Sequence, residues 1–126
     1  MSNDISDHPG LLAVIDNDPR YPLEAYRFVM RALAFTVRER PRPGHISGRE
    51  LLDGVRRLGI NEYGRLARLV FKTWNVSRTD DVGAIVFNLV EAGLLSRRDN
   101  DRIEDFIDAF DLATSLDAPE DYTLSQ

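Results

Sequence analysis

The side chains able to carry out chemistry are few in this chain, and they form no recognisable catalytic motif. Cysteine is absent, which excludes a thiolate nucleophile and a cysteine-held metal site. A general base or metal site built on the two histidines, His8 and His45, would need further groups that the sequence does not place, and His45 fits better as the residue leading into a capped helix. The serines lie in expected caps or loops, and none occurs in a Gly-x-Ser-x-Gly motif. We therefore expect no catalytic residue, no metal site and no cofactor.

Acidic residues are numerous, and they occupy positions where helix starts and turns favour them. Asp80 and Asp81 fall in the first turn of an expected helix, where the helix dipole stabilises carboxylates. Residues 99–101 form an expected turn. The sequence contains neither the calcium-binding loop motif nor the glycine-rich loop that holds phosphates. A small hydrolase or transferase that uses paired carboxylates is therefore our third interpretation of the function. Protein binding and nucleic-acid binding come before it.

The candidate binding residues are three cations, Arg65, Arg68 and Lys72. Apolar residues in the stretch 63–74 have the three-then-four spacing of a helix, and the three cations recur at the same spacing on its other side. The wider segment 20–78 holds 13 basic and 5 acidic residues, a net charge of +8. Such a surface attracts nucleic-acid phosphates or an acidic protein surface.

Nucleic-acid binding meets two difficulties in the pattern. In a helix-turn-helix with Gly59 at the turn, the second helix should bury positions near 65 and 68, and both are arginine. In a winged helix, the recognition helix would be residues 79–92, which contain no Lys or Arg. Nucleic-acid binding through the basic stripe of residues 62–74 is therefore the alternative to binding a protein.

The basic stripe has a possible acidic counterpart near the C-terminus. Residues 79–126 hold 3 basic and 12 acidic residues, a net charge of −9. The acidic side chains on the outer side of an expected helix there are Asp101, Glu104, Asp105 and Asp108. Exposed ion pairs contribute only about 0–1 kcal/mol each, so pairing of the two stripes would select a register rather than hold the fold. The stripes could meet within one chain or between two copies, or both could be solvated surfaces.

Hydrophobic periodicity predicts a mainly α domain, a compact bundle of about five helices with at most one or two very short strands. Trp74 is expected at the centre of its core. A tight break is expected at 59–61, and 94–97 is a candidate extended piece. The run 11–15 fits either a helical turn or a strand. The expected helical segments are 22–40, 47–58, 63–74, 79–92 and 103–110.

Local signals define several of these helix ends. Ser47 and Glu50 have the spacing of a capping box, in which each side chain binds the other residue's backbone N–H. Thr79 is the expected N-cap of the following long helix, and Gly93 is its expected stop. Asp18 fits a turn or cap before the first long helix.

Length and composition indicate one domain. The chain has 126 residues, of which 43% are hydrophobic. We expect a flexible leader at 1–10, a helical domain at 11–112 and a polar tail at 113–126 that is either disordered or lies on the surface. The N-terminus lacks the cationic start and apolar run of a secretory signal, and no apolar stretch approaches the roughly 20 residues that span a bilayer. These features predict a cytoplasmic protein that does not bind membranes.

Three runs of sequence resemble a family of small uncharacterised bacterial proteins. The first run, at 18–29, contains DPRYP followed by EAY and FV. The second, at 45–52, contains HISG followed by ELL. The third, at 86–95, is VFNLVEAGLL. The resemblance covers roughly residues 15–111. It implies a bacterial helical domain and brings no activity with it.

Polar-tipped side chains within these runs are surrounded by apolar residues. They are Arg20, Tyr21, Asn88 and Glu91. Because buried polar groups need hydrogen-bond partners, we expect a buried polar network that joins the first long helix to the fourth. The combined prediction is a non-enzymatic module that binds an unidentified protein partner or a second copy of itself.

Overall fold

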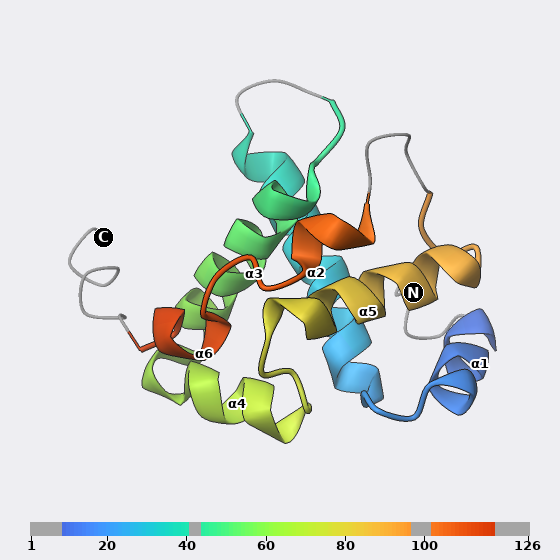
Figure 1. Cartoon of the computed structure of the whole chain (residues 1–126), viewed down its shortest axis with the longest axis horizontal. Coiled ribbons are helices and arrows are strands. Elements are labelled where there is room, and N and C mark those ends of the chain that lie inside the picture. The colour runs from blue at the N-terminus through green and yellow to red at the C-terminus, as the bar shows by residue number, and fades with distance from the viewer. Residues whose placement is uncertain (1–8, 41–43, 97–101, 118–126) are drawn as a thin grey trace.

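The computed structural model describes residues 9–40, 44–96 and 102–117. These residues form a mainly α bundle without strands, which confirms the predicted fold class (Figure 1). The 3-10 helices are η2 (Gly64–Leu66) and η3 (Ile103–Phe106). The α-helices are α1 (Pro9–Asn17), α2 (Leu23–Glu39), α3 (Gly48–Tyr63), α4 (Ala67–Thr73), α5 (Thr79–Glu91) and the single-turn α6 (Leu112–Ser115).

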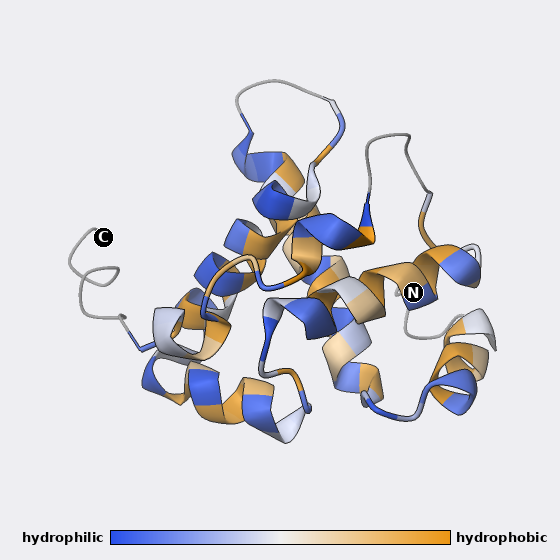
Figure 2. Ribbon diagram, viewed as in Figure 1, coloured by the Kyte–Doolittle hydropathy of each residue, from blue (hydrophilic) through white to orange (hydrophobic). Residues whose placement is uncertain are grey.

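The two longest helices, α2 and α3, form the largest contact in the bundle. Each has one apolar side, and Figure 2 shows polar residues on the outer surface of α3. Tyr26 from α2, Leu52 from α3 and both Ile85 and Leu89 from α5 are fully buried, so the core lies where these three helices meet. Burying one such side chain stabilises the fold by about 1.5–3 kcal/mol.

The start of α3 follows the predicted capping box. The Ser47 hydroxyl accepts a hydrogen bond from the Glu50 N–H at 3.1 Å, and the Glu50 carboxylate accepts one from the Ser47 N–H at 2.9 Å. These bonds satisfy two N–H groups that a helix start leaves without intrahelical partners. The bond from the Ser47 backbone is also the main reason why the pKa of Glu50 is lowered.

The predicted break at 59–61 is wrong, because α3 continues to Tyr63. Gly59 serves close packing instead of a turn: a Cβ there would lie 2.9 Å from the ring of Phe71 in α4, closer than real Cβ contacts. The break comes at Gly64, whose φ of 54° is readily adopted only by glycine. The expected helix 63–74 is therefore divided into η2 and α4.

This division changes which residues of the segment are buried. Ala67 and Phe71 point inward as predicted, but Leu66, expected on the buried side, is 60% exposed. The tighter winding of η2 moves Leu66 off the face that α4 buries. Trp74 is half-buried and packs against the edge of the core, so its predicted central position is also wrong.

The chain after α5 differs from the expected helix over 103–110. Only Ile103–Phe106 is helical, as η3, and Asp108 has a positive φ of 45°. Phe106 is buried as predicted, whereas Ile103 and Ile107 are 39% and 51% exposed. The candidate extended piece at 94–97 is a turn where it is described, because the N–H groups of Leu94 and Leu95 bond back to the carbonyl of Leu89.

The ordered chain extends past both predicted boundaries of the domain. The run 11–15 lies in α1, which starts at Pro9, within the predicted leader; residues 1–8 lie outside the described part of the chain. In the predicted tail, α6 reaches Ser115 and Leu116 is buried in the core. The described part of the tail therefore belongs to the domain.

The α2–α3 contact yields a prediction about stability. A Cβ at Gly54 would overlap the Thr36 hydroxyl, which donates to the Ala32 carbonyl at 2.7 Å, and would lie 3.2 Å from the Thr36 Cβ. Gly54→Ala should lower the free energy of unfolding by about 1–3 kcal/mol through overpacking, even though alanine favours helix by about 1 kcal/mol. Urea denaturation followed by circular dichroism measures the change.

Thr36→Ala provides the matching background for this test. Because it removes the overlapping hydroxyl, Gly54→Ala should cost less than half as much in the Thr36→Ala protein as in the wild type. Equal costs in the two backgrounds would contradict the proposed close contact.

Candidate functional site

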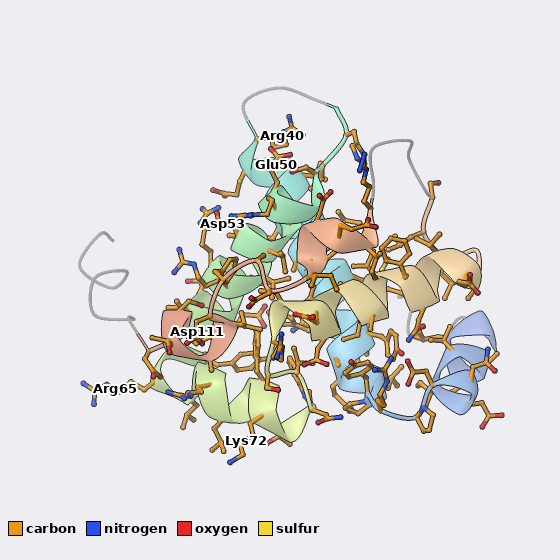
Figure 3. All side chains as sticks on the ribbon, in the orientation of Figure 1. Arg40, Glu50, Asp53, Arg65, Lys72 and Asp111 are labelled. Atoms are coloured by element: carbon orange, nitrogen blue, oxygen red, sulfur yellow. The ribbon has the colours of Figure 1, made fainter. Side chains whose placement is uncertain are left out.

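The predicted cations lie on one exposed surface at the end of α3. Figure 3 shows Arg65 and Lys72 pointing away from the body of the domain. Arg68 is exposed as well, and Leu66 and Leu69 lie among the three cations at 60% and 58% exposure. We call Arg65, Leu66, Arg68, Leu69 and Lys72 the α4 surface. Sequence reasoning identified its three cations and missed both leucines.

The α4 surface rests on a cluster of aromatic rings. The ring centroids of Phe71 and Trp74 are 5.6 Å apart in a stacked arrangement, and Phe28 of α2 lies 5.4 Å and 5.3 Å from them. Tyr63 closes the cluster at 5.9 Å from Trp74. Aromatic contacts of this kind add about 0.5–1.5 kcal/mol per pair beyond area burial, so they fix the position of α4.

The electrostatic partners of the three cations differ from the predicted acidic stripe. Arg68 forms an exposed ion pair with Asp117. Within the described residues, Arg65 and Lys72 have no ion pair. η3 packs against α5 and α3, and the Asp108 N–H bonds to Asp80 of α5, so the described acidic residues of the stripe lie away from α4. Asp101 lies outside the described residues.

The predicted polar network is centred on Asp18, in the turn between α1 and α2. Arg20 binds the Asp18 carboxylate through two nitrogens, at 2.8 and 2.7 Å. Asn88 of α5 donates to the same carboxylate at 2.8 Å and to the Tyr26 hydroxyl at 3.0 Å. A single amide group thus connects α2, α5 and the turn. The structure brings Arg20 and Asn88 together on one carboxylate, but the predicted burial is wrong for Arg20 and Glu91, which are both exposed.

Tyr21 makes a second connection to α5. Its buried hydroxyl donates to Asp81 at 2.6 Å, and the Arg20 guanidinium lies over its ring, 5.0 Å from the centroid. Burial and the Asp81 hydrogen bond raise the pKa of Tyr21. The phenol therefore stays a hydrogen-bond donor at neutral pH, so it is a structural link rather than a base.

The backbone N–H groups at the start of α5 donate to Asp81 and not to the predicted N-cap, Thr79. The second carboxylate oxygen of Asp81 accepts the N–H groups of Ser77 and Arg78, both at 3.0 Å. Thr79, the predicted N-cap, is the first residue of the helix and is fully buried. Its hydroxyl donates to the Phe106 carbonyl at 2.7 Å and so binds η3 to α5.

The described residues contain neither a metal-ligand cluster nor a membrane-spanning helix. Within them, no three His, Asp or Glu side chains lie close enough together to hold a metal ion. None of the described helices has the length and apolar character needed to cross a membrane. The α4 surface is therefore the candidate functional site, and the Asp18 network is a structural element.

Comparisons with protein-family models, with curated proteins and with solved structures found no match to this chain.

The Tyr21 link to α5 should contribute measurably to stability. Because the hydroxyl is buried and its acceptor is charged, Tyr21→Phe should lower the free energy of unfolding by about 1–2 kcal/mol. Chemical denaturation of Tyr21→Phe, Asp81→Asn and the double variant gives the coupling energy of the pair. A coupling near zero would show that the two groups act independently.

Asp18 should make stability depend on pH in the acidic range. Its hydrogen bonds, above all those from Arg20, lower its pKa in the folded protein. Its contribution is therefore complete above the unfolded-state pKa of about 3.9 and is lost as the pH falls toward the folded-state pKa. Asp18→Asn should cost about 1 kcal/mol at pH 7 and less at pH 3. Urea denaturation at both pH values measures this difference.

Asp16→Asn is the matched control for Asp18, since Asp16 is exposed on α1 two residues earlier. Its replacement should change the free energy of unfolding by less than about 0.5 kcal/mol. A cost of Asp18→Asn that stays constant from pH 7 to pH 3 would contradict the assigned role of the carboxylate.

Proposed function

We propose that this chain is a non-enzymatic interaction module that binds an acidic, amphipathic segment of a partner protein through the α4 surface. The observation that supports it is the pair of exposed leucines among three cations, Leu66 at the end of η2 and Leu69 in α4. Single exposed apolar residues are common on proteins, but two exposed leucines three positions apart, each flanked by cations, are a candidate contact for an apolar partner. A partner would bury both leucines.

The charges on the α4 surface select the kind of partner. Arg65 and Lys72 have no ion pair within the described residues, so they are available to carboxylates of another chain. Arginine is enriched at protein interfaces, where apolar anchors lie at the centre and charges at the rim. A segment with apolar residues flanked by Asp or Glu complements this arrangement, and the charges would mainly raise the association rate and specificity.

The size of the α4 surface sets an expected strength. One short helix contributes a small interface, at the low end of the sizes known for specific complexes. We therefore expect a transient complex with a dissociation constant on the order of micromolar. The rigid support from Phe28, Phe71 and Trp74 favours binding, because little additional order is imposed on this side.

The sequence interpretation adds a biological setting to this proposal: a bacterial protein that acts in the cytoplasm and belongs to a family of small uncharacterised proteins. Self-association is a related form of the proposal, since the acidic segment 102–117 of a second copy is a candidate partner for the α4 surface. Sedimentation of the purified protein distinguishes a pair of like chains from a different partner.

Nucleic-acid binding is the second candidate, favoured by the two projecting cations Arg65 and Lys72. It leaves Leu66 and Leu69 without a role, because phosphates offer no apolar contact. A nucleic acid held mainly by phosphates would be released as salt rises, and its retention would depend on Arg65 and Arg68. A complex anchored by the leucines would depend less on salt.

The test is affinity purification from the native host with Leu66→Ser/Leu69→Ser beside the wild type. The double variant should retain at least tenfold less of a specific protein partner, because the apolar anchors of the interface are removed. Quantitative mass spectrometry of the eluates measures the loss. Leu12→Ser is the matched control, since Leu12 is 64% exposed on α1 and lies outside the α4 surface.

Charge variants separate the two candidates. Arg65→Ala/Arg68→Ala should weaken a protein complex only modestly, whereas it should abolish retention of DNA or RNA at low salt. Arg38→Ala, an exposed arginine at the end of α2, is the control for loss of charge alone. Full retention of the partner by the leucine variant would refute the proposed use of the α4 surface.

A further inference from the structure

A pocket of about 240 Å³ lies at the opposite end of α3 from the α4 surface. Leu33 and Val37 of α2 form one wall, and Val86 and Val90 of α5 form another. Phe106 of η3 and the residues leading into α3 complete it. η3 packs against both α5 and α3, and its position between the start of α3 and α5 can be followed in Figure 1.

The described lining of the pocket is apolar and carries no Asp, Glu, Lys or Arg side chain. Its polar members are His45, Ser47 and Ser96. The Ser47 hydroxyl accepts the Glu50 N–H in the capping box. A charged ligand would lose its hydration against these walls, whose described residues are mostly apolar, so the walls favour an uncharged molecule.

Burial differs between the floor and the mouth of the pocket. Ile46, Leu51 and Phe106 are 9%, 5% and 3% exposed and form the floor. Val37 is 50% exposed, and Gly44 is exposed, so these residues lie at the mouth. Within the described part of the chain, the space is therefore a concave site with a buried floor and an exposed mouth.

The pocket is held open by contacts that need no ligand. At Gly48 a Cβ would lie 3.1 Å from the Phe106 ring. Because glycine has no Cβ, the ring packs closely against α3 and forms part of the pocket floor. The Arg40 guanidinium donates to the His45 carbonyl and lies 3.5 Å from the Glu50 carboxylate, which fixes the segment at the mouth. Figure 3 shows Arg40 and Glu50 together at the start of α3.

The volume limits the size of the occupant. An apolar cavity of about 150 Å³ accommodates benzene, and sites for drug-sized ligands usually span about 300–1,000 Å³. Between these values, 240 Å³ accommodates one fused pair of rings. The Phe87 and Phe106 rings meet edge to face at 6.4 Å, so an aromatic guest has ring edges and faces to pack against.

From the volume, the mostly apolar lining and the preformed walls, we propose that this pocket binds a compact, uncharged apolar ring compound no larger than a bicyclic aromatic. This site is separate from the α4 surface, and its ligand binding does not depend on the interaction function proposed above.

Indole is the probe, titrated into ¹⁵N-labelled full-length protein and followed by amide chemical shifts. Saturable shifts should cluster at residues 44–48, 86–90 and 103–106. Val37→Trp should weaken binding at least tenfold, because the larger side chain covers the mouth. Leu12→Trp is the matched control, since Leu12 is 64% exposed on α1 and lies outside both the pocket lining and the α4 surface, and it should leave indole affinity within twofold of the wild type.

Indole-3-acetate tests the requirement for an uncharged ligand and should bind at least fivefold more weakly than indole. Absent or unsaturable shifts, shifts centred on α4, equal binding by Val37→Trp, or tighter binding of indole-3-acetate would each overturn the assignment. If Val37→Trp fails to fold, the positions of the wild-type shifts decide the question alone.

Discussion

Close packing against α3 is the constraint on which the rest of the structure depends. Three glycines of this helix each allow a side chain from a different helix to pack closely against the α3 backbone. The pairs are Gly48 with Phe106 of η3, Gly54 with Thr36 of α2, and Gly59 with Phe71 of α4. A methyl group at any of these glycines would meet an atom of the neighbour at or below the closest ordinary distance. Glycine inside a helix costs about 0.5–1 kcal/mol relative to alanine, and here the closer packing offsets that cost.

Short-range signals in the sequence predicted the parts of this fold that short-range contacts determine. The capping box of Ser47 and Glu50 is local, and the amphipathic spacing of α2 and α5 follows from helix geometry alone. Gly59 has no such local signature. Its role depends on a ring that arrives from another helix, so a turn was the natural interpretation of a glycine followed by Asn61. Likewise, the burial of Leu66 and Trp74 was predicted wrongly because residues 63–74 do not form one continuous helix. The positive φ of Gly64 ends α3, and η2 precedes α4.

The polar network shows the same division between local and distant contacts. The sequence marked Arg20, Tyr21 and Asn88 as polar groups in apolar surroundings, which is a property of each run alone. Their shared acceptor, Asp18, was interpreted only as a turn residue, because its partner Asn88 is 70 positions away. The α4 surface was half predicted for a related reason. Charge spacing is visible along one helix, whereas the exposure of Leu69 depends on how α4 lies against the domain.

The placement of the acidic C-terminal segment explains why the α4 surface stays available. Thr79 binds the Phe106 carbonyl and Asp80 binds the Asp108 N–H, so this segment is attached to the start of α5. Of the described acidic residues, Asp117 reaches the basic stripe, through Arg68. An exposed pair of that kind contributes about 0–1 kcal/mol, so a partner's carboxylate can replace it at little cost. Arg65 and Lys72 have no ion pair within the described residues, so the cations beside Leu66 and Leu69 can serve recognition rather than folding.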